Sequence, residues 1–289
     1  MVHQTIKYMM YKRFLFLFAF HILLINSVLS QSYEELFKGT RIVNGHSVNA
    51  QNEGELEFLI EHRFGRVNGG AYNLYGLDQS SIRFGLEYGI KNWASVGVGR
   101  SSFKKTFDGF AKIRFYRQQS GEKEVPFSLT LLSSVALNSL KFQDPSRKNY
   151  FSSRLSFSHQ ILIARKFTER LSLQLMPTVV HRNLVPTKAE KNLVVSLGIA
   201  GRYKITKTFA TSIEYYYVLP NQLPETYHNS LAIGFEIDTG GHAFQFHFTN
   251  STGMLERDFI VENGGNFQDG DIHLGFNITR IFKIKGRRY

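Results

Sequence analysis

Residues that could do chemistry gather in the stretch HAFQFHFTNSTG at positions 242–253. His247 stands two residues before Thr249 and four before Ser251, and hydrolases use a histidine beside a hydroxyl group to activate a nucleophile. Thr249 is a poorer nucleophile than serine here, because its methyl group crowds the attack. On an extended strand, Ser251 cannot share a face and a hydrogen bond with His247 unless the chain turns at Asn250. The pattern favours a structural role for His247, with catalysis as the alternative.

His247 has a second potential partner in His273. If the two lie on adjacent antiparallel strands, their imidazoles point to the same side with Asp271 close by, and a metal or another cation could bind there. Two histidines without a third defined ligand are a weak metal signal, so a polar hydrogen-bond network is the simpler interpretation. We therefore predict no metal site and no cofactor. The sequence contains no HExxH motif and no phosphate-binding or dinucleotide-binding loop.

The same stretch has the alternation of a β-strand, since Phe244, Phe246 and Phe248 fall on every second residue. From residue 54 onward this alternation recurs in segments of about eight to twelve residues that are separated by turn-rich stretches. An even number of such strands suits an up-and-down antiparallel barrel. The twelve expected strands are 55–64, 81–90, 94–101, 107–117, 127–138, 153–165, 171–182, 192–203, 209–218, 230–238, 242–250 and 271–282.

The connections between these segments alternate in length. Those after the even-numbered segments are short, and those after the odd-numbered segments are long, except for SFKKT at 102–106. Membrane barrels sort their loops in this way, because short turns lie in the periplasm and long loops face outward. Both ends of a chain with an even number of strands then lie in the periplasm.

The two faces of the segments differ in polarity. In the first segment Leu56, Phe58 and Ile60 share one face, opposite Glu57 and Glu61. Periodicity does not decide which face is inside. The export signal, the loop lengths and the strand lengths favour apolar faces toward lipid and polar faces toward the lumen. The expected lumen network consists of Glu57, Glu61, Arg83, Glu87, Lys112, Arg114, Glu214, Glu236, His247 and His273.

One histidine departs from this pattern. His159 falls on the apolar face of segment 153–165, where an imidazole would face hydrocarbon near mid-strand. We expect a bulge near Ser158, or a shifted register, to turn it away from lipid.

Composition and the N-terminus indicate an exported protein. The chain of 289 residues has no cysteine, which excludes disulfides, thiolate zinc sites and cysteine nucleophiles. Basic residues precede an apolar run at 14–25, and small residues follow at Val28 and Ser30, which is typical of a cleaved signal peptide over residues 1–30. The net charge of +12 is spread over many short segments without a nucleic-acid-binding motif. Outer-membrane lipids are therefore the expected partner, and nucleic acid is not.

Residues 31–53 lie between the signal peptide and the expected barrel at 54–289, and they show no clear period. This segment is either a leader or a plug that enters the lumen, because twelve strands enclose a narrow interior that natural barrels tend to fill. In a plug, the expected pairs join Arg41, Asn44 and His46 to the inward carboxylates Glu57, Glu61 and Glu87.

Four segments resemble a family of exported Bacteroidota β-barrel proteins of unknown function: 37–47, 62–90, 246–255 and 270–282. The resemblance implies an outer-membrane barrel and carries no substrate, cofactor or catalytic residue. The last strand is also similar to the C-terminal signal that the barrel-assembly machinery recognises. Its aromatic residue, Phe282, is followed by KIKGRRY at 283–289, so Tyr289 is the alternative terminal aromatic.

The sequence thus predicts an all-β, up-and-down antiparallel transmembrane barrel of about twelve strands. Its expected function is non-enzymatic: a narrow pore, a solute or lipid conduit, or a docking protein. Two alternatives stay open, an outer-membrane lipid-modifying hydrolase that uses His247 and a soluble periplasmic β-protein that binds an apolar ligand.

Overall fold

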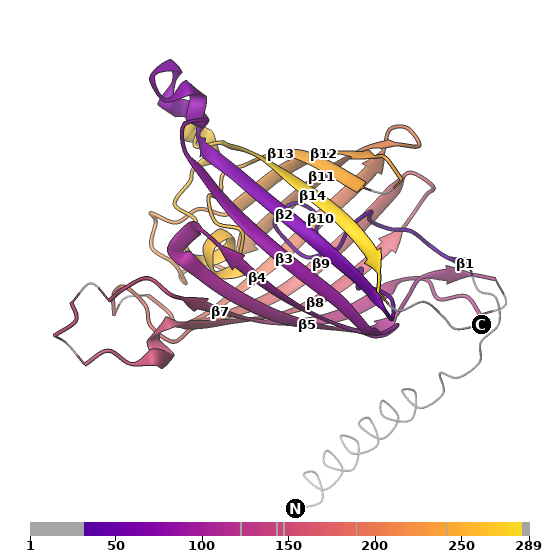
Figure 1. Ribbon diagram of the computed structural model, residues 1–289, viewed down its shortest axis with the longest axis horizontal. Coiled ribbons are helices and arrows are strands. Elements are labelled where there is room, and N and C mark those ends of the chain that lie inside the picture. The colour runs from indigo at the N-terminus through magenta and orange to yellow at the C-terminus, as the bar shows by residue number, and fades with distance from the viewer. Residues whose placement is uncertain are drawn as a thin grey trace, which may run out of the picture. The chain divides into compact units, whose positions relative to one another are not determined.

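The computed structural model describes residues 32–284 except residues 122, 143, 147, 189 and 241. The predicted signal peptide and Tyr289 lie outside the described residues. Within the described chain, twelve antiparallel strands form a closed barrel (Figure 1), in which consecutive barrel strands pair and β14 closes the ring on β2. The predicted all-β antiparallel barrel is confirmed.

The predicted segments correspond one to one with the barrel strands, and those at 94–101, 171–182, 209–218 and 230–238 match at both ends. The strands are β2 (Glu55–Arg66), β3 (Ser80–Lys91), β4 (Ala94–Ser101), β5 (Thr106–Tyr116), β7 (Ser128–Asn138), β8 (Leu155–Lys166), β9 (Leu171–Arg182), β10 (Leu193–Lys204), β11 (Phe209–Val218), β12 (Ser230–Asp238), β13 (His242–Thr249) and β14 (His273–Lys283).

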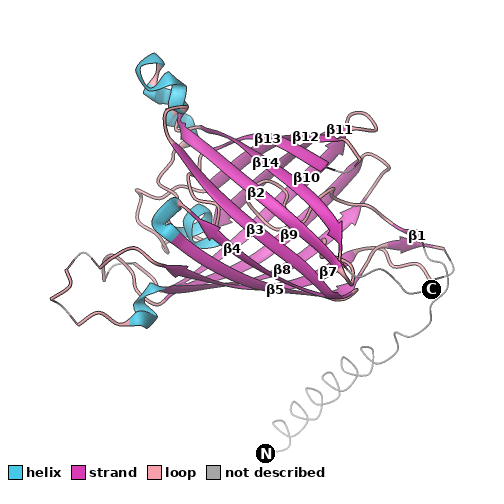
Figure 2. Cartoon of the chain, viewed as in Figure 1, coloured by secondary structure: helices cyan, strands magenta, loops and turns pink. Residues whose placement is uncertain are grey.

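Short elements outside the barrel wall complete the fold (Figure 2). Two strands of two residues each are β1 (Ser32–Tyr33) and β6 (Gln119–Ser120). The helical turns are η1 (Val67–Gly69), η2 (Ala71–Gly76), η3 (Phe103–Lys105), η4 (Phe151–Arg154), the π-helix η5 (Arg257–Val261) and η6 (Phe267–Asp269). Within the part of the chain that the structure describes, no helix has the length and apolar character needed to cross a membrane.

The two faces of the wall differ as the alternation requires. In β10, Leu197 and Ile199 are exposed on the outside, whereas Val194 and Ala200 are buried inside. Other exposed outward side chains are also apolar: Phe84, Leu86, Val96, Val98, Leu131, Val135, Ile161, Leu175, Ile213, Phe244 and Phe246. Such a continuous apolar exterior suits hydrocarbon and not water.

His159 does point outward, and the predicted bulge or register shift is wrong. Along the described residues the register of β7 with β8 runs without a shift, and Ser133 stands opposite His159. The Ser133 Oγ and His159 Nδ1 atoms are 2.9 Å apart, within hydrogen-bond distance. This bond gives one ring nitrogen a partner and so reduces the cost of an imidazole in an apolar setting.

Most of the long connections lie at one end of the barrel, which we call the long-loop end, together with the short connection 102–105. The other end, which we call the short-turn end, has connections of two to four residues except for 117–127. Much of the longest connection, residues 250–272, is buried, although Gln268 and Asp269 near its end are exposed. It folds back into the barrel through η5, and its apolar side chains are buried: Met254, Leu255, Phe259, Ile260 and Val261.

Candidate functional site in the barrel interior

The barrel interior contains residues 36–51, which we call the inner segment and which precede the first barrel strand. Inward side chains of the wall bind its backbone. Gln174 on β9 accepts a hydrogen bond from the Val48 N–H at 2.7 Å and donates one to the His46 carbonyl at 2.8 Å. Thr130 on β7 donates to the Val48 carbonyl at 2.8 Å, and Asn277 on β14 donates to the Val43 carbonyl at 3.0 Å. Side chains thus satisfy buried peptide groups that regular secondary structure would otherwise pair.

The tightest feature of the inner segment is a turn around Glu214, an inward residue of β11. The Glu214 carboxylate accepts hydrogen bonds from three consecutive backbone N–H groups, those of Val43 at 3.3 Å, Asn44 at 3.1 Å and Gly45 at 2.9 Å. Gly45 permits this approach, because a Cβ atom there would lie 2.2 Å from the Tyr216 hydroxyl oxygen. The surface of the turn is therefore closely complementary to the inner surface of the wall.

Inward charges of β2 to β5 form a second group of contacts. Arg83 donates to Glu61 at 2.5 Å and to both carboxylate oxygens of Asp108 at 2.9 and 2.6 Å. Lys112 lies 3.2 Å from Glu87 and donates to the Asn49 carbonyl at 2.8 Å. These wall charges bind one another and also bind the inner segment.

The remaining predicted lumen residues also have contacts on the inside of the barrel. The Glu57 carboxylate accepts a hydrogen bond from the Thr40 hydroxyl, and Arg114 donates to the Ala50 carbonyl. Arg202 pairs with Glu236 at 2.7 Å. The structure thus places the predicted polar residues on the inside of the barrel. Five of the ten contact the inner segment, namely Glu57, Glu61, Lys112, Arg114 and Glu214.

One of the three predicted plug residues has an expected partner, and the other two do not. Arg41 lies 3.9 Å from Glu61, which is one of the predicted pairs. Asn44 instead accepts from Arg63 at 2.7 Å and donates to Thr249 at 3.2 Å. The predicted pairing of Asn44 with Glu57, Glu61 or Glu87 is wrong, because the turn around Glu214 directs its side chain toward β2 and β13.

The predicted pairing of His46 with the same carboxylates is also wrong. His46 Nε2 lies 3.6 Å from Glu256, a residue of the infolded connection, and its ring packs edge-on against Phe110 with 4.6 Å between centroids. His46 therefore joins the inner segment to the long connection, which the sequence placed outside the barrel.

His247 does not form a hydrolase site with the hydroxyl groups that follow it. Its side chain is buried, and neither ring nitrogen has a hydrogen-bond partner among the described residues. Thr249 accepts from Asn44 instead, and Ser251 donates to the Gly253 carbonyl at 3.1 Å. A nucleophile paired with a base is the first requirement of such a site, and this arrangement lacks it.

His273 is occupied by structural contacts. Its Nδ1 lies 2.8 Å from the Phe64 carbonyl and its Nε2 lies 3.0 Å from the Thr252 hydroxyl. Because a carbonyl only accepts, Nδ1 carries the proton and Nε2 accepts from Thr252 in the neutral ring. The described residues contain no group of three or more side chains placed to hold a metal ion.

The infolded connection is held by charges at the long-loop end. Glu262 is paired with Lys104 at 2.6 Å, with Arg257 at 2.9 Å and with Arg182 at 3.2 Å. Burial alone would raise the pKa of Glu262, but Lys104 and Arg257 lower that pKa to about 2. Lys104 also lies 2.9 Å from Asp258, so one lysine bridges two carboxylates of the connection.

The inner segment and the infolded connection meet in a buried apolar cluster against the inward faces of β7 to β11. Tyr216 packs edge-on against Phe259 with ring centroids 5.1 Å apart. The cluster comprises Leu36, Phe37, Ile42 and Val48 from the inner segment, Phe259, Ile260 and Val261 from the connection, and Leu132, Leu162, Ala164, Met176, Val180, Val194, Ala200 and Tyr216 from the wall. The lumen is thus filled by two segments with both polar and apolar contacts.

Comparison with known proteins assigns the chain to a family. The family model described as Membrane bound beta barrel domain (DUF5777) matches residues 37–282. The chain belongs to this family. The assignment confirms the resemblance to a β-barrel family of unknown function, and a membrane-bound barrel agrees with the apolar exterior. No curated protein matches the chain.

Solved structures similar to this DUF5777 barrel include three outer-membrane proteins. The NanC porin has a TM-score of 0.48 and 8% identity, with 80% of this chain and 100% of that chain covered. The KdgM porin has a TM-score of 0.45 and 10% identity over 79% and 99% of the two chains. Outer membrane phospholipase A from Escherichia coli has a TM-score of 0.45 and 9% identity over 78% and 89%. These values carry no information on function.

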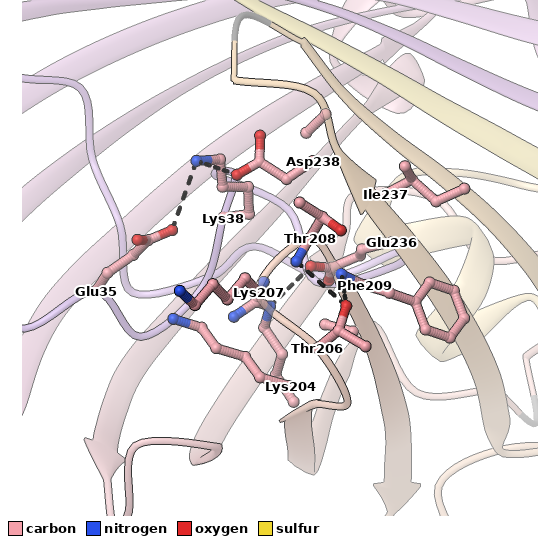
Figure 3. Close-up of a pocket in the computed structure, with 13 residues that line it drawn as sticks. Glu35, Lys38, Lys204, Thr206, Lys207, Thr208, Phe209, Glu236, Ile237 and Asp238 are labelled. Atoms are coloured by element: carbon pink, nitrogen blue, oxygen red, sulfur yellow. Dashed lines mark hydrogen bonds and ion pairs between the residues drawn. The ribbon is translucent and has the colours of Figure 1, made fainter.

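At the short-turn end of the DUF5777 barrel, a lysine fastens the inner segment to the wall (Figure 3). The Lys38 ammonium lies 2.7 Å from Asp238 at the end of β12 and 3.8 Å from Glu35. The cavity beside it, lined also by Lys204 and Lys207, has a volume of about 40 Å³. That space suits water and is too small for an organic ligand.

Several residues of the interior were missed by the sequence-based prediction. Arg63 and Asp108 lie on inward faces that the alternation already marked as polar, so they could have been found. The burial of Phe259, Ile260 and Val261 also had a signal, since three consecutive apolar residues are unusual in an exposed loop. No sequence signal indicated that Leu132 and Leu162 are buried inside the barrel, because lumen-facing positions were expected to be polar.

Proposed function

We propose that this DUF5777 barrel is an outer-membrane conduit for small polar solutes, with residues 36–51 acting as a plug that closes it at rest. The membrane-bound family and the apolar exterior support the location. In this proposal the short-turn end faces the periplasm, the long loops face outward and the signal peptide over residues 1–30 is removed. Lipids surround the wall, and β14 is the strand that the barrel-assembly machinery recognises.

The observation that carries the proposal is the way the inner segment is held. Its backbone is bound by polar side chains from different parts of the ring, including Thr130, Gln174, Glu214 and Asn277. Water can replace each of these hydrogen bonds when the segment leaves, so the net cost of each exchange is about 1 kcal/mol. A segment needed only to fill space would be held more simply by apolar side chains.

Deletion of residues 31–53 tests the plug. We expect single-channel conductance in planar bilayers to rise well above that of the intact protein, because the buried side chains of residues 36–51 are removed from the lumen. Deletion of residues 71–76 is the matched control, since η2 is an exposed turn at the long-loop end where Tyr72 is 94% exposed. That deletion should leave conductance unchanged.

Heat-modifiable gel mobility would show that both deletion variants still form a barrel. A folded variant that lacks residues 31–53 and conducts no better than the intact protein would overturn the plug. The hydrolase alternative is not proposed, because no observation on His247 favours it.

A further inference from the structure

A cavity with a volume of about 420 Å³ opens at the long-loop end, and this volume is within the usual range for small-molecule sites. It lies between β2, β3 and the connection of residues 250–272. No carboxylate is among its described lining residues, which include Arg63, Arg66, Gln79, Ser81, Thr252 and His273. The cavity is therefore polar with an excess of positive charge.

Arg63 provides the most unusual charge. Its side chain is fully buried, and its guanidinium donates to the Asn44 side chain at 2.7 Å and to the His62 carbonyl at 3.1 Å. Its Nε has no hydrogen-bond partner, and no ion pair within 4.0 Å involves Arg63 in the described chain. The two carboxylates whose charges act on it, Glu61 and Glu214, already accept hydrogen bonds from other donors, namely Arg83 and the inner segment. A buried cation without a paired anion is costly, so an anion brought near it is attracted.

Ser81 provides a second free donor. It stands opposite Arg63 in the pairing of β2 with β3, on the same inward face. Its side chain is 8% exposed, and its hydroxyl has no partner among the residues that the structure describes. Serine hydroxyls that are buried in this way normally make a hydrogen bond. Arg63 and Ser81 thus leave hydrogen-bonding capacity unused on one wall of the cavity.

The other polar groups define the surroundings of this wall. Arg66 is partly exposed at the rim, where it pairs with Asp271 at 2.9 Å. The two ring nitrogens of His273 are already occupied, so this residue shapes the cavity and adds no free donor in its neutral form. Gln79 is exposed and offers an amide to a ligand that enters from outside.

We propose that this cavity binds the oxyanion group of a small polar solute, either a carboxylate, a sulfate or a phosphate. The Ser81 hydroxyl donates a hydrogen bond to the anion, and the charge of Arg63 beneath the cavity wall attracts it with little screening by salt. Gln79 at the rim binds the neutral polar part of the solute. The site lies outside the inner segment, so binding does not require the plug to open and does not depend on the proposed conduit.

The test is isothermal titration of the full-length barrel in an uncharged detergent with glucuronate and with sulfate. Glucose is the neutral match to glucuronate. We expect saturable binding of glucuronate and sulfate and none of glucose. Arg63→Gln should weaken glucuronate binding by about tenfold or more, because the buried positive charge that attracts the anion is removed. Ser81→Ala should weaken it by about threefold to tenfold.

Arg100→Gln is the matched control, since Arg100 is an exposed arginine of β4 over the Phe107 ring and does not line the cavity. It should bind glucuronate as the unmodified protein does. Heat-modifiable mobility would identify an Arg63→Gln variant that fails to fold. In that case glucuronate binding by Ser81→Ala tests the proposal, because the Ser81 hydroxyl makes no hydrogen bond to any other described residue and its removal should not affect folding.

Three results would overturn the proposal: equal binding of glucose and glucuronate, unchanged affinity in folded variants of both Arg63 and Ser81, or binding to phosphatidylglycerol vesicles without binding of either soluble anion. The last outcome would identify a lipid headgroup as the source of the oxyanion. Because titration is done on the closed barrel, failure here leaves the conductance test of the plug intact.

Discussion

At the scale of single residues, the interior depends on close fits between the inner segment and individual wall side chains. Burying the Glu214 carboxylate would cost several kcal/mol if it lacked donors. The three N–H groups of residues 43–45 supply those donors, and they can do so only because no side chain at Gly45 separates them from the wall. The same position therefore controls whether the segment can remain inside.

Gly45→Ala should loosen the inner segment. The new Cβ would lie 2.2 Å from the Tyr216 hydroxyl oxygen and 3.2 Å from a Glu214 carboxylate oxygen, so the turn must move away from its hydrogen-bond acceptor. We expect higher open probability in bilayers and faster proteolysis within residues 36–51. Gly39→Ala is the control, since its Cβ would meet nothing nearer than 3.8 Å. Equal behaviour of the two variants would contradict the close fit.

At the scale of elements, the infolded connection of residues 250–272 is a second barrier that is held differently from the inner segment. Its apolar residues in η5 pack on the central cluster, and Glu262 fixes its far side through Lys104, Arg182 and Arg257. Glu262 is a single carboxylate with three cations, so its ion pairs are sensitive to acid, whereas the hydrogen bonds of the inner segment to Gln174 and Asn277 involve no titratable side chain.

Acid should release this connection through Glu262. Its pKa is about 2 in the folded barrel against an ordinary value of 4.5, so the stabilisation is complete above about pH 4.5 and is lost as pH falls toward about 2. The stabilisation is on the order of 3 kcal/mol at neutral pH. Burial raises the pKa of Asp258 above its ordinary value of 3.8. Protonation of Asp258 therefore stabilises the folded connection as the pH falls, and this gain is complete at about pH 3.8. Below that pH only the loss from Glu262 continues.

Hydrogen exchange of residues 255–262 measures this effect. We expect protection to fall between about pH 4.5 and pH 2 in the unmodified protein. Glu262→Gln should lower protection already at neutral pH and remove the drop. Glu225→Gln, at an exposed position of the connection between β11 and β12, is the control and should behave as the unmodified protein does. A pH profile of Glu262→Gln identical to that of the unmodified protein would rule out Glu262 as the acid-sensitive group.

At the scale of the whole molecule, the wall could be predicted from the sequence and most of the interior contacts could not. Strand positions follow from alternation within about ten residues, which is a local signal. The contact of Asn44 with Thr249 joins residues 205 positions apart, and it depends on which strands face each other across the lumen. The environment of His159 was not predicted for the same reason, because its ring nitrogen is within hydrogen-bond distance of Ser133 on the neighbouring strand. The alternation within one strand does not indicate which residues of other strands or segments each side chain will contact.

In the proposed conduit a solute must pass the inner segment, and a reversible covalent lock can test this. An ideal Cβ at position 234 of β12 would lie 3.1 Å from a γ-methyl carbon of Val43, so Val43→Cys and Gly234→Cys are close enough for a disulfide. The chain has no other cysteine. In the Gly45→Ala background, we expect oxidation of this pair to return conductance to the low level of the unmodified protein, and reduction to restore it. Gly234→Cys without the Val43 change should show no redox dependence. Oxidised channels that conduct as well as reduced ones would mean that solutes bypass residues 36–51, and the plug would then have to be sought in the infolded connection instead.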